Sequence, residues 1–217
     1  MMEVQYLKSI VRDAIDVPSV MNLAGIPFSS ISHANWKDAY PYCPEVKFRV
    51  AANSLSFFLH FQVTEDSIRA RYGTDNGKVW TDSCVEFFSQ PTDDGIYYNL
   101  ECNCIGTVLL GAGVGRNNRE HANAETLGSI QRWASLGRRP FEEKRGRTTW
   151  EVALIVPFAA FFKHRIRVME GRTIKANFYK CGDELAQPHF LSWNPIQLPN
   201  PDFHCPEFFG ELSVLSE

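Results

Sequence analysis

Apolar and polar residues alternate with a period of two through most of this sequence. In Leu55–Val63 every odd-numbered residue is apolar, and the even-numbered residues include serine, histidine and glutamine. A β-strand points alternate side chains to opposite faces of its sheet, so this pattern predicts strands with one buried face. Further strands are predicted at Val46–Ala52, Cys84–Gln90, Ile96–Cys104, Thr107–Leu110, Ile130–Ala134, Thr148–Val156, Ile174–Cys181, Phe190–Trp193 and Glu211–Leu215.

Helices are predicted at only two places. One is Val4–Ile15, and the other is Phe158–His164, which follows Pro157. The segment Gly111–Gly128 is polar and rich in glycine, which predicts a long loop. Frequent short strands without regular helices between them are typical of an all-β fold, here an antiparallel β-sandwich of the jelly-roll or immunoglobulin-like type. No break in composition and no internal repeat divides the chain, so residues 1–217 are predicted to form a single domain.

The balance of charge argues against nucleic acid as a partner. The 22 lysines and arginines and the 25 aspartates and glutamates give a net charge of −3, without the basic run that a phosphate backbone attracts. Residues 1–16 carry charges throughout and lack the apolar stretch of a secretory signal. No apolar run is long enough to cross a membrane. As written, the chain is expected in the cytoplasm and away from membranes; it is expected to be secreted if a leader was removed.

Six cysteines occur in the chain. Cys84, Cys102 and Cys104 lie in apolar strand-like runs, where a free thiol behaves as a small buried hydrophobe. No pair has the spacing of a zinc ligand motif or of a redox-active dithiol. We therefore expect six reduced structural thiols, consistent with a reducing compartment.

Polar side chains interrupt two successive predicted strands. Glu86 points away from its apolar neighbours Val85 and Phe87. On the next strand, the face opposite the apolar one carries Tyr97, Asn99, Glu101 and Asn103. Carboxylate, amide and phenol groups pair well with sugar hydroxyls, which both donate and accept hydrogen bonds. Two plainer interpretations stay open, because these residues also suit a solvated sheet face and Glu86 suits an ion pair with an arginine.

Two tryptophans stand beside turn-forming residues. Trp80 precedes the strand that contains Glu86, and Trp193 lies near the C-terminus, before Asn194 and Pro195. Flat aromatic faces stack on the C–H face of a pyranose ring. Either tryptophan also fits a place in the core, since large aromatic residues are mostly buried.

The segments VWTDSCVEFF, YYNLECNCIGT, SWNP and PDFHCPEFFGEL, taken in this order, resemble the carbohydrate-binding module family 9-like domains of the DOMON-like sandwich group. The resemblance covers residues 29–215 approximately. It implies a non-catalytic domain in which two tryptophans clamp a mono- or oligosaccharide and polar strand residues bind its hydroxyls. Matched position by position, Trp80 and Trp193 are the aromatic pair, Glu86 is the acidic ligand, and Asn99 and Glu101 lie on the polar strand.

The resemblance also bears on cofactors and partners. No cofactor is expected, although some family modules carry structural calcium, for which Asp66 and Asp82 are candidates despite the absence of an EF-hand spacing. Family members are usually attached to a glycoside hydrolase. This sequence contains no such domain, so a separate glycoside hydrolase is the expected partner.

Other functions remain open. Glu86 and Glu101 are a candidate carboxylate pair for a glycoside hydrolase. A haem or other cofactor carrier of the DOMON-like kind needs axial ligands such as Met169 and a histidine, and a protein-interaction module would use 111–128. A metal or acid–base group is conceivable at His189, Asp202 and His204, but their proline and phenylalanine neighbours favour a loop that closes over the sandwich.

Overall fold

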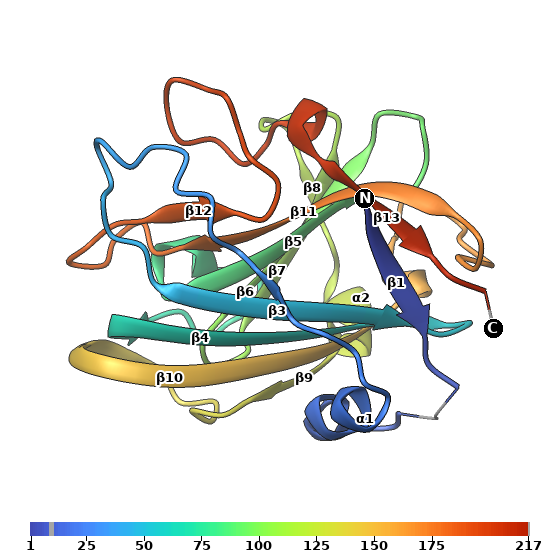
Figure 1. Ribbon diagram of the computed structural model, residues 1–217, viewed down its shortest axis with the longest axis horizontal. Helices are drawn as coiled ribbons and strands as arrows, with labels where there is room; N and C mark the ends of the chain where they lie inside the picture. Colours follow the sequence, from blue (N-terminus) through green and yellow to red (C-terminus); the bar gives the residue numbers. More distant parts are fainter. Residues whose placement is uncertain (9–10, 217) are drawn as a thin grey trace.

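Two curved β-sheets face each other and share one apolar core (Figure 1). The computed structural model describes residues 1–8 and 11–216. The first sheet contains, in spatial order, β8 (Glu120–His121), β7 (Val108–Gly113), β6 (Tyr97–Asn103), β5 (Cys84–Gln90), β11 (Thr173–Cys181) and β13 (Gly210–Val214), with β12 (Phe190–Ser192) paired to one end of β11. The second contains β3 (Glu45–Ala52), β4 (Ser56–Ala70), β10 (Phe141–Pro157) and β9 (Gln131–Ala134), with β2 (Ser29–Ser30) on β3.

Strand β1 (Met2–Tyr6) joins the two sheets. Met2–Val4 pair in parallel with β13, and Gln5 and Tyr6 pair in parallel with β3. The other strand pairs are antiparallel. The predicted antiparallel β-sandwich is therefore confirmed, and β1 is the exception within it.

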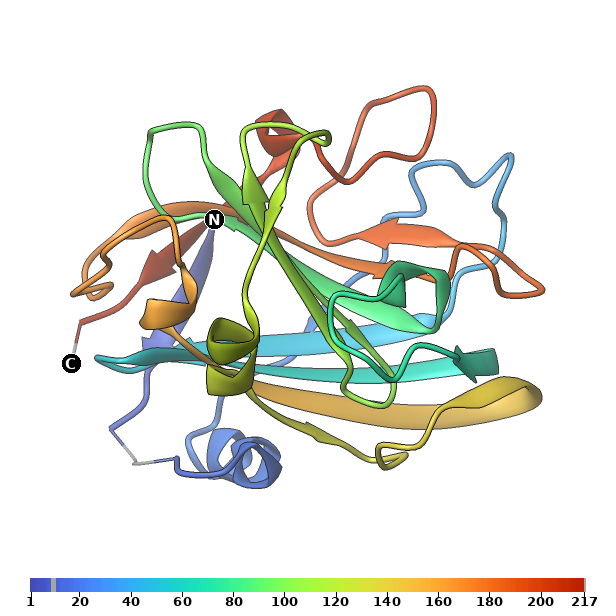
Figure 2. The ribbon, with the colours of Figure 1, turned by 180° about the vertical axis from the view of Figure 1, so that it is seen from behind.

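Helical structure is short. The helices are η1 (Ala14–Asp16), α1 (Val17–Leu23), η2 (Val79–Thr81), α2 (Ala124–Ser129), η3 (Phe158–Ala160) and η4 (Pro206–Phe208). Helix α1 covers the outer side of the second sheet (Figures 1 and 2), where Val17 and Met21 pack against apolar residues of β3, β4 and β10. Within residues 1–8 and 11–216, no helix combines the length and the apolar character that crossing a membrane requires.

The prediction of a helix over Val4–Ile15 is wrong. Its first residues form β1, because burial of Val4 and backbone pairing to two strands outweigh local helix preference. Residues 9 and 10 of the predicted helix lie outside the described residues. The α-helix begins only at Val17, after Asp13 caps the preceding 3-10 turn.

Two further segments differ from expectation. The helix predicted at Phe158–His164 is only the 3-10 turn η3. The predicted loop Gly111–Gly128 begins as the end of β7, contains β8 and ends in α2. Helix α2 begins there because the Asn123 side chain accepts a hydrogen bond from the Thr126 N–H at 2.8 Å.

The core between the sheets is aromatic. The Phe178 ring of β11 lies 5.0 Å from the Phe87 ring and 4.0 Å from the Phe48 ring of the opposite sheet. Because side chains alternate along a strand, the residues next to these core positions point to the outer face of the first sheet. That outer face is covered by the loop between β2 and β3 and by the segment between β12 and β13, which pack on it through Trp36, Ile196 and Phe209.

Candidate functional site

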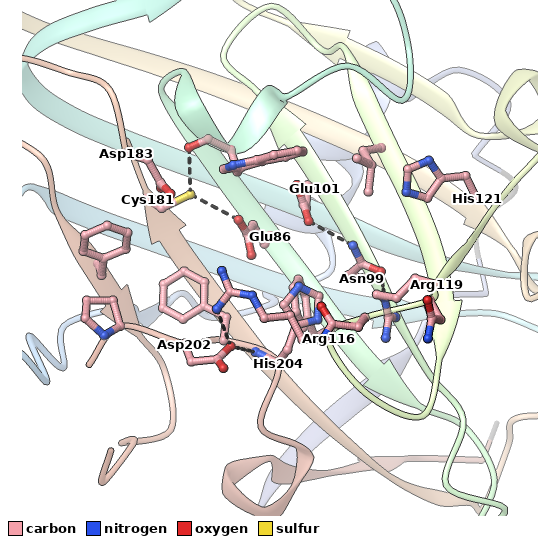
Figure 3. A pocket seen from close by; sticks show the side chains of 18 residues that line it. Glu86, Asn99, Glu101, Arg116, Arg119, His121, Cys181, Asp183, Asp202 and His204 are labelled. Carbon is pink, nitrogen blue, oxygen red and sulfur yellow. Dashed lines mark hydrogen bonds and ion pairs between the residues drawn. The ribbon is translucent and has the colours of Figure 1, made fainter. Parts of the chain in front are cut away.

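A cavity of about 430 Å³ opens on the outer face of the first sheet (Figure 3). Its floor is formed by side chains of β5, β6, β7 and β11, and its walls come from η2, the loop before β8 and the segment 201–204. Its volume is in the range of small-molecule sites. Four of the five predicted site residues, Trp80, Glu86, Asn99 and Glu101, line this cavity.

Two buried glutamates lie side by side on the floor. Glu86 of β5 and Glu101 of β6 are directly opposite each other in the antiparallel pair, with side chains 3% and 5% exposed. Glu86 Oε1 accepts a hydrogen bond from the Cys181 thiol at 3.1 Å, and Glu101 Oε1 accepts one from Asn99 Nδ2 at 2.9 Å. Their Oε2 atoms have no hydrogen-bond partner among the described residues. Each glutamate therefore has one buried oxygen whose hydrogen-bonding capacity is not met by the described residues.

Burial changes the acidity of this floor. Desolvation raises the pKa of Glu86 well above its ordinary value, and charge repulsion from the neighbouring Glu101 raises it further. Desolvation likewise raises the pKa of Glu101 to about 7 and that of Asp183 to about 6. A carboxyl that keeps its proton near neutral pH can donate as well as accept a hydrogen bond.

Arg119 holds the amide of Asn99 in place. Its Nε donates to Asn99 Oδ1 at 2.8 Å, and its terminal nitrogens donate to the carbonyl oxygens of Tyr97 and Gly115 at 2.8 and 2.9 Å. The guanidinium also lies 4.1 Å from the centre of the Tyr97 ring. These bonds fix the direction of the Asn99 amide, whose nitrogen then faces Glu101 (Figure 3).

Gly111 leaves space for this amide. It lies opposite Asn99 in the β6–β7 pair, and a Cβ at this position would be 2.5 Å from Asn99 Oδ1. Any other residue would therefore displace the Asn99 side chain, so the glycine is needed for the geometry of the floor.

Charged and aromatic groups form the rim. Arg116 is an exposed residue whose Nη1 lies 3.2 Å from Asp202 Oδ1. His204 hydrogen-bonds the Tyr97 hydroxyl at 2.9 Å, and desolvation lowers the pKa of His204 to about 4, so it is neutral at physiological pH. The aromatic lining consists of Trp80, Phe88, Phe190 and Phe203. The cavity thus combines flat apolar surfaces with carboxyl, amide and guanidinium groups.

The structure does not bring Trp193 to the cavity. Its ring lies 6.2 Å from Phe48 and 5.9 Å from Phe178, both in the core between the sheets, and a Cβ on Gly210 would touch it at 2.7 Å. This corrects the expected placement of Trp193 opposite Trp80. The phenylalanines that share the cavity with Trp80 are Phe88 of β5, Phe190 of β12 and Phe203 of the segment 201–204.

The calcium candidates do not form a site together. Asp82 is fully buried, and its two carboxylate oxygens accept hydrogen bonds from four N–H groups, those of Arg69 Nε, Arg71 N, Tyr72 N and Asn103 Nδ2. Asp66 is exposed and lies 3.7 Å from Arg147. Calcium needs six to eight oxygen ligands, and the donors around Asp82 are nitrogens, so the residues present do not fit this ion.

The other candidate residues are also separated. Met169 is buried in the core between the sheets, away from the cavity lining. His189 is buried beside Lys180, with Nε2 2.6 Å from the lysine Nζ, whereas Asp202 and His204 line the cavity. The segment 201–204 does close over the sheet, as expected from its proline and phenylalanine content.

Sequence reasoning missed Cys181, Asp183, Arg116, Arg119 and the three phenylalanines of the lining, Phe88, Phe190 and Phe203. Cys181 has a signal in hindsight, because it continues the alternation of Asn177 and Tyr179 along β11. The pairing of β11 with β5, which brings Cys181 to Glu86, joins residues 95 positions apart. Such a pairing carries no local sequence signature.

Comparisons with known proteins show the family to which the chain is similar. The family model described as carbohydrate-binding family 9 matches residues 15–214. A protein of Bacteroides uniformis ATCC 8492, provisionally described as carbohydrate-binding, is 47% identical, with a TM-score of 0.96 over 98% of both chains. No curated protein matches.

Two more distant solved structures share the fold. They are a family 9 module of Caldicellulosiruptor kristjanssonii in complex with glucose and one from the same organism with cellotriose. Each is 11% identical to this chain with a TM-score of 0.61, and the match covers 100% of this chain and 96% or 94% of the other.

Proposed function

Because the chain belongs to carbohydrate-binding family 9, we propose that its cavity binds a mono- or oligosaccharide end and does no chemistry on it. The observation that carries this proposal is the pair of unpartnered oxygens, Glu86 Oε2 and Glu101 Oε2, on the cavity floor. A buried polar atom without a partner costs about 1–3 kcal/mol. A ligand that donates two hydrogen bonds from one side would offset that cost.

Adjacent sugar hydroxyls meet this requirement. Side chains directly opposite on neighbouring strands have Cβ atoms about 5 Å apart, so Glu86 and Glu101 suit two hydroxyls of one ring. The free lone pair of the Asn99 carbonyl and the rim guanidinium of Arg116 add further hydrogen-bonding groups. Trp80 supplies an apolar face on which a pyranose ring stacks, with Phe190 and Phe203 forming the aromatic surface of the C-terminal loops.

Glucose and short β-glucans are the first ligands to test, since family modules of the same fold were solved with glucose and cellotriose. We expect dissociation constants on the order of micromolar to millimolar, because one sugar unit removes few apolar atoms from water. A separate glycoside hydrolase acting on the same saccharide is the partner that we propose.

A hydrolytic role for Glu86 and Glu101 is disfavoured by their placement. Both side chains project from the same face of one sheet and lie on directly paired residues. A glycosidase needs its two carboxyl groups on either side of the scissile bond, whereas these two would meet the same side of a sugar ring.

Calorimetry with a panel of mono- and disaccharides tests the proposal. We expect Glu86→Gln, Glu101→Gln and Trp80→Ala each to weaken binding at least about tenfold, equivalent to the loss of one good contact. Trp193→Phe is the matched control for Trp80, and Glu142→Gln, on the distant β10, is the control for the acids; both should bind normally. If the wild type binds a sugar and all three site variants bind it equally well, the sugar binds elsewhere. If the wild type binds no sugar of the panel, the proposal is refuted.

A further inference from the structure

Two thiols and one carboxylate converge beside the cavity. Cys84 of β5 and Cys181 of β11 are directly opposite each other in their antiparallel pair, and both point to the outer face, as does Glu86. The two Sγ atoms and a Glu86 oxygen all lie within 4.8 Å of one another. The three residues are 0%, 1% and 3% exposed. None of the proposed sugar contacts requires such a cluster of thiols.

From this cluster we propose a binding site for one thiophilic divalent cation, Zn²⁺ being the natural case, held by Cys84 Sγ, Cys181 Sγ and Glu86 Oε1. Zinc prefers thiolate and carboxylate ligands in a tetrahedron. Zinc–sulfur bonds of about 2.3 Å place two sulfur ligands about 3.8 Å apart. The cluster therefore needs only a small adjustment of side-chain torsions to close around the ion.

The surroundings supply what such a site needs. Cys181 and Glu86 both line the cavity, which gives the ion a path of entry and leaves its fourth position open to water or to Asp183 (Figure 3). Glu86 Oε2 has no partner and stays available. Binding converts both thiols to thiolates and Glu86 to a carboxylate, and the protons of these three groups are released to solvent. Lys180, whose Nζ donates to the Cys181 carbonyl at 2.8 Å and pairs with Glu65, lies behind the resulting negative charge.

The site does not depend on sugar binding. In the structure the Cys181 thiol donates to Glu86 Oε1, and the cation would replace that proton while Glu86 Oε2 still faces the cavity. Failure of the metal site would leave the saccharide proposal intact, and a saccharide panel without binding would leave the metal site intact.

Co²⁺ is a suitable probe because cobalt bound to thiolates absorbs strongly in the near ultraviolet. The full chain, reduced with a phosphine and confirmed by thiol titration to hold six free thiols, is titrated with Co²⁺ and then with Zn²⁺. We expect one Co²⁺ per chain, a thiolate charge-transfer band, and loss of that band as Zn²⁺ displaces Co²⁺.

Cys84→Ser and Cys181→Ser should each weaken Zn²⁺ binding by more than about 100-fold, which exceeds the effect of losing a hydrogen-bond partner of a ligand. The matched control is Cys102→Ser, which removes a buried thiol from the core face of β6 and should leave the band unchanged. The proposal is overturned if reduced wild-type protein shows no thiolate band, or if the band persists in both ligand variants. The wild-type spectrum alone decides the matter should a serine variant fail to fold.

Discussion

Buried glutamates occur in two regions of the protein, and their hydrogen-bond and ion-pair partners differ. In the core between the sheets, Glu65 Oε1 accepts a hydrogen bond from Trp150 Nε1 at 2.7 Å, and Glu65 Oε2 forms an ion pair with Lys180 Nζ at 3.0 Å. On the cavity floor, Glu86 and Glu101 have only neutral donors, a thiol and an amide. The core acid carries its counter-charge within the fold, whereas each cavity acid has one oxygen without a hydrogen-bond partner among the described residues, as the proposed sugar site requires. Burial alone therefore does not distinguish structural from binding carboxylates; the identity of the partners does.

Removing the core cation should have the largest effect. Lys180→Met leaves Glu65 buried without its ion-pair partner, and breaking a buried pair on one side costs about 3–5 kcal/mol. Urea unfolding followed by tryptophan fluorescence measures this loss. Lys175→Met, on an exposed position of the same strand, is the control, and equal stability of the two variants would remove the contrast between the regions.

The cavity acids should instead reduce stability as they ionise. The raised pKa of Glu101, about 7 in the folded protein against 4.5 ordinarily, means that the folded state binds its proton more tightly than the unfolded state does. Its contribution is full below pH 4.5 and is lost as the pH rises through 7, by up to about 3 kcal/mol.

Urea unfolding of wild type and Glu101→Gln from pH 4 to pH 8 checks this. As the pH rises, the free energy of unfolding of Glu101→Gln should increase relative to that of the wild type, because glutamine cannot ionise. Glu142→Gln, on an exposed acid, should track the wild type. A constant difference would mean that Glu101 has an ordinary pKa, and the contrast with Glu65 would weaken.

A smaller effect is expected from the glycine beneath the floor. Gly111→Ala places a methyl group against Asn99 Oδ1, which should turn the amide away from Glu101 and weaken saccharide binding about tenfold, or roughly 1.4 kcal/mol. In Gly113→Ala, two residues along the same strand, the methyl group would lie 3.5 Å from Arg119 Cγ, an ordinary contact. Calorimetry should separate the two, and equal affinities would show that the Asn99 amide does not position the sugar.

The smallest effect concerns a fourth buried acid, Asp82. Asp82 already accepts four hydrogen bonds from N–H groups, so added Ca²⁺ should shift the melting temperature by less than about 1 °C. Thermal unfolding with Ca²⁺ and with a chelator measures this, and Mg²⁺ controls for ionic strength. A clear rise specific to Ca²⁺ would mean that the ion binds elsewhere on the fold.

Much of this arrangement could be predicted from alternation and motif order. The period-two pattern placed Asn99 and Glu101 on one face and Glu86 on the outer face of its strand, and the family resemblance is confirmed by the match over residues 15–214. Both inferences rest on short-range pattern, which survives folding when the buried face of a strand is well defined.

The features that the sequence did not predict depend on contacts between residues far apart in the chain. The sequence around Trp193 does not show whether its ring packs on Phe178 or faces a ligand. Trp80 and Trp193 both stand beside turn-forming residues, yet only Trp193 packs on Phe178. Cys181 reaches Glu86 only through the pairing of β11 with β5, and β1 is a strand only because β13 and β3 accept it. Local propensity carries no information about such partners.

The strand that joins the two sheets has a consequence for the order of assembly. Met2 pairs with Leu212, while Gln5 pairs with Ala51, so the seam between the sheets closes only after segments from opposite ends of the sequence have met. Closing so large a loop costs conformational entropy before the stabilising contacts form, which slows folding. During synthesis, Met2–Val4 therefore cannot complete their pairing until β13, near the end of the sequence, has been made.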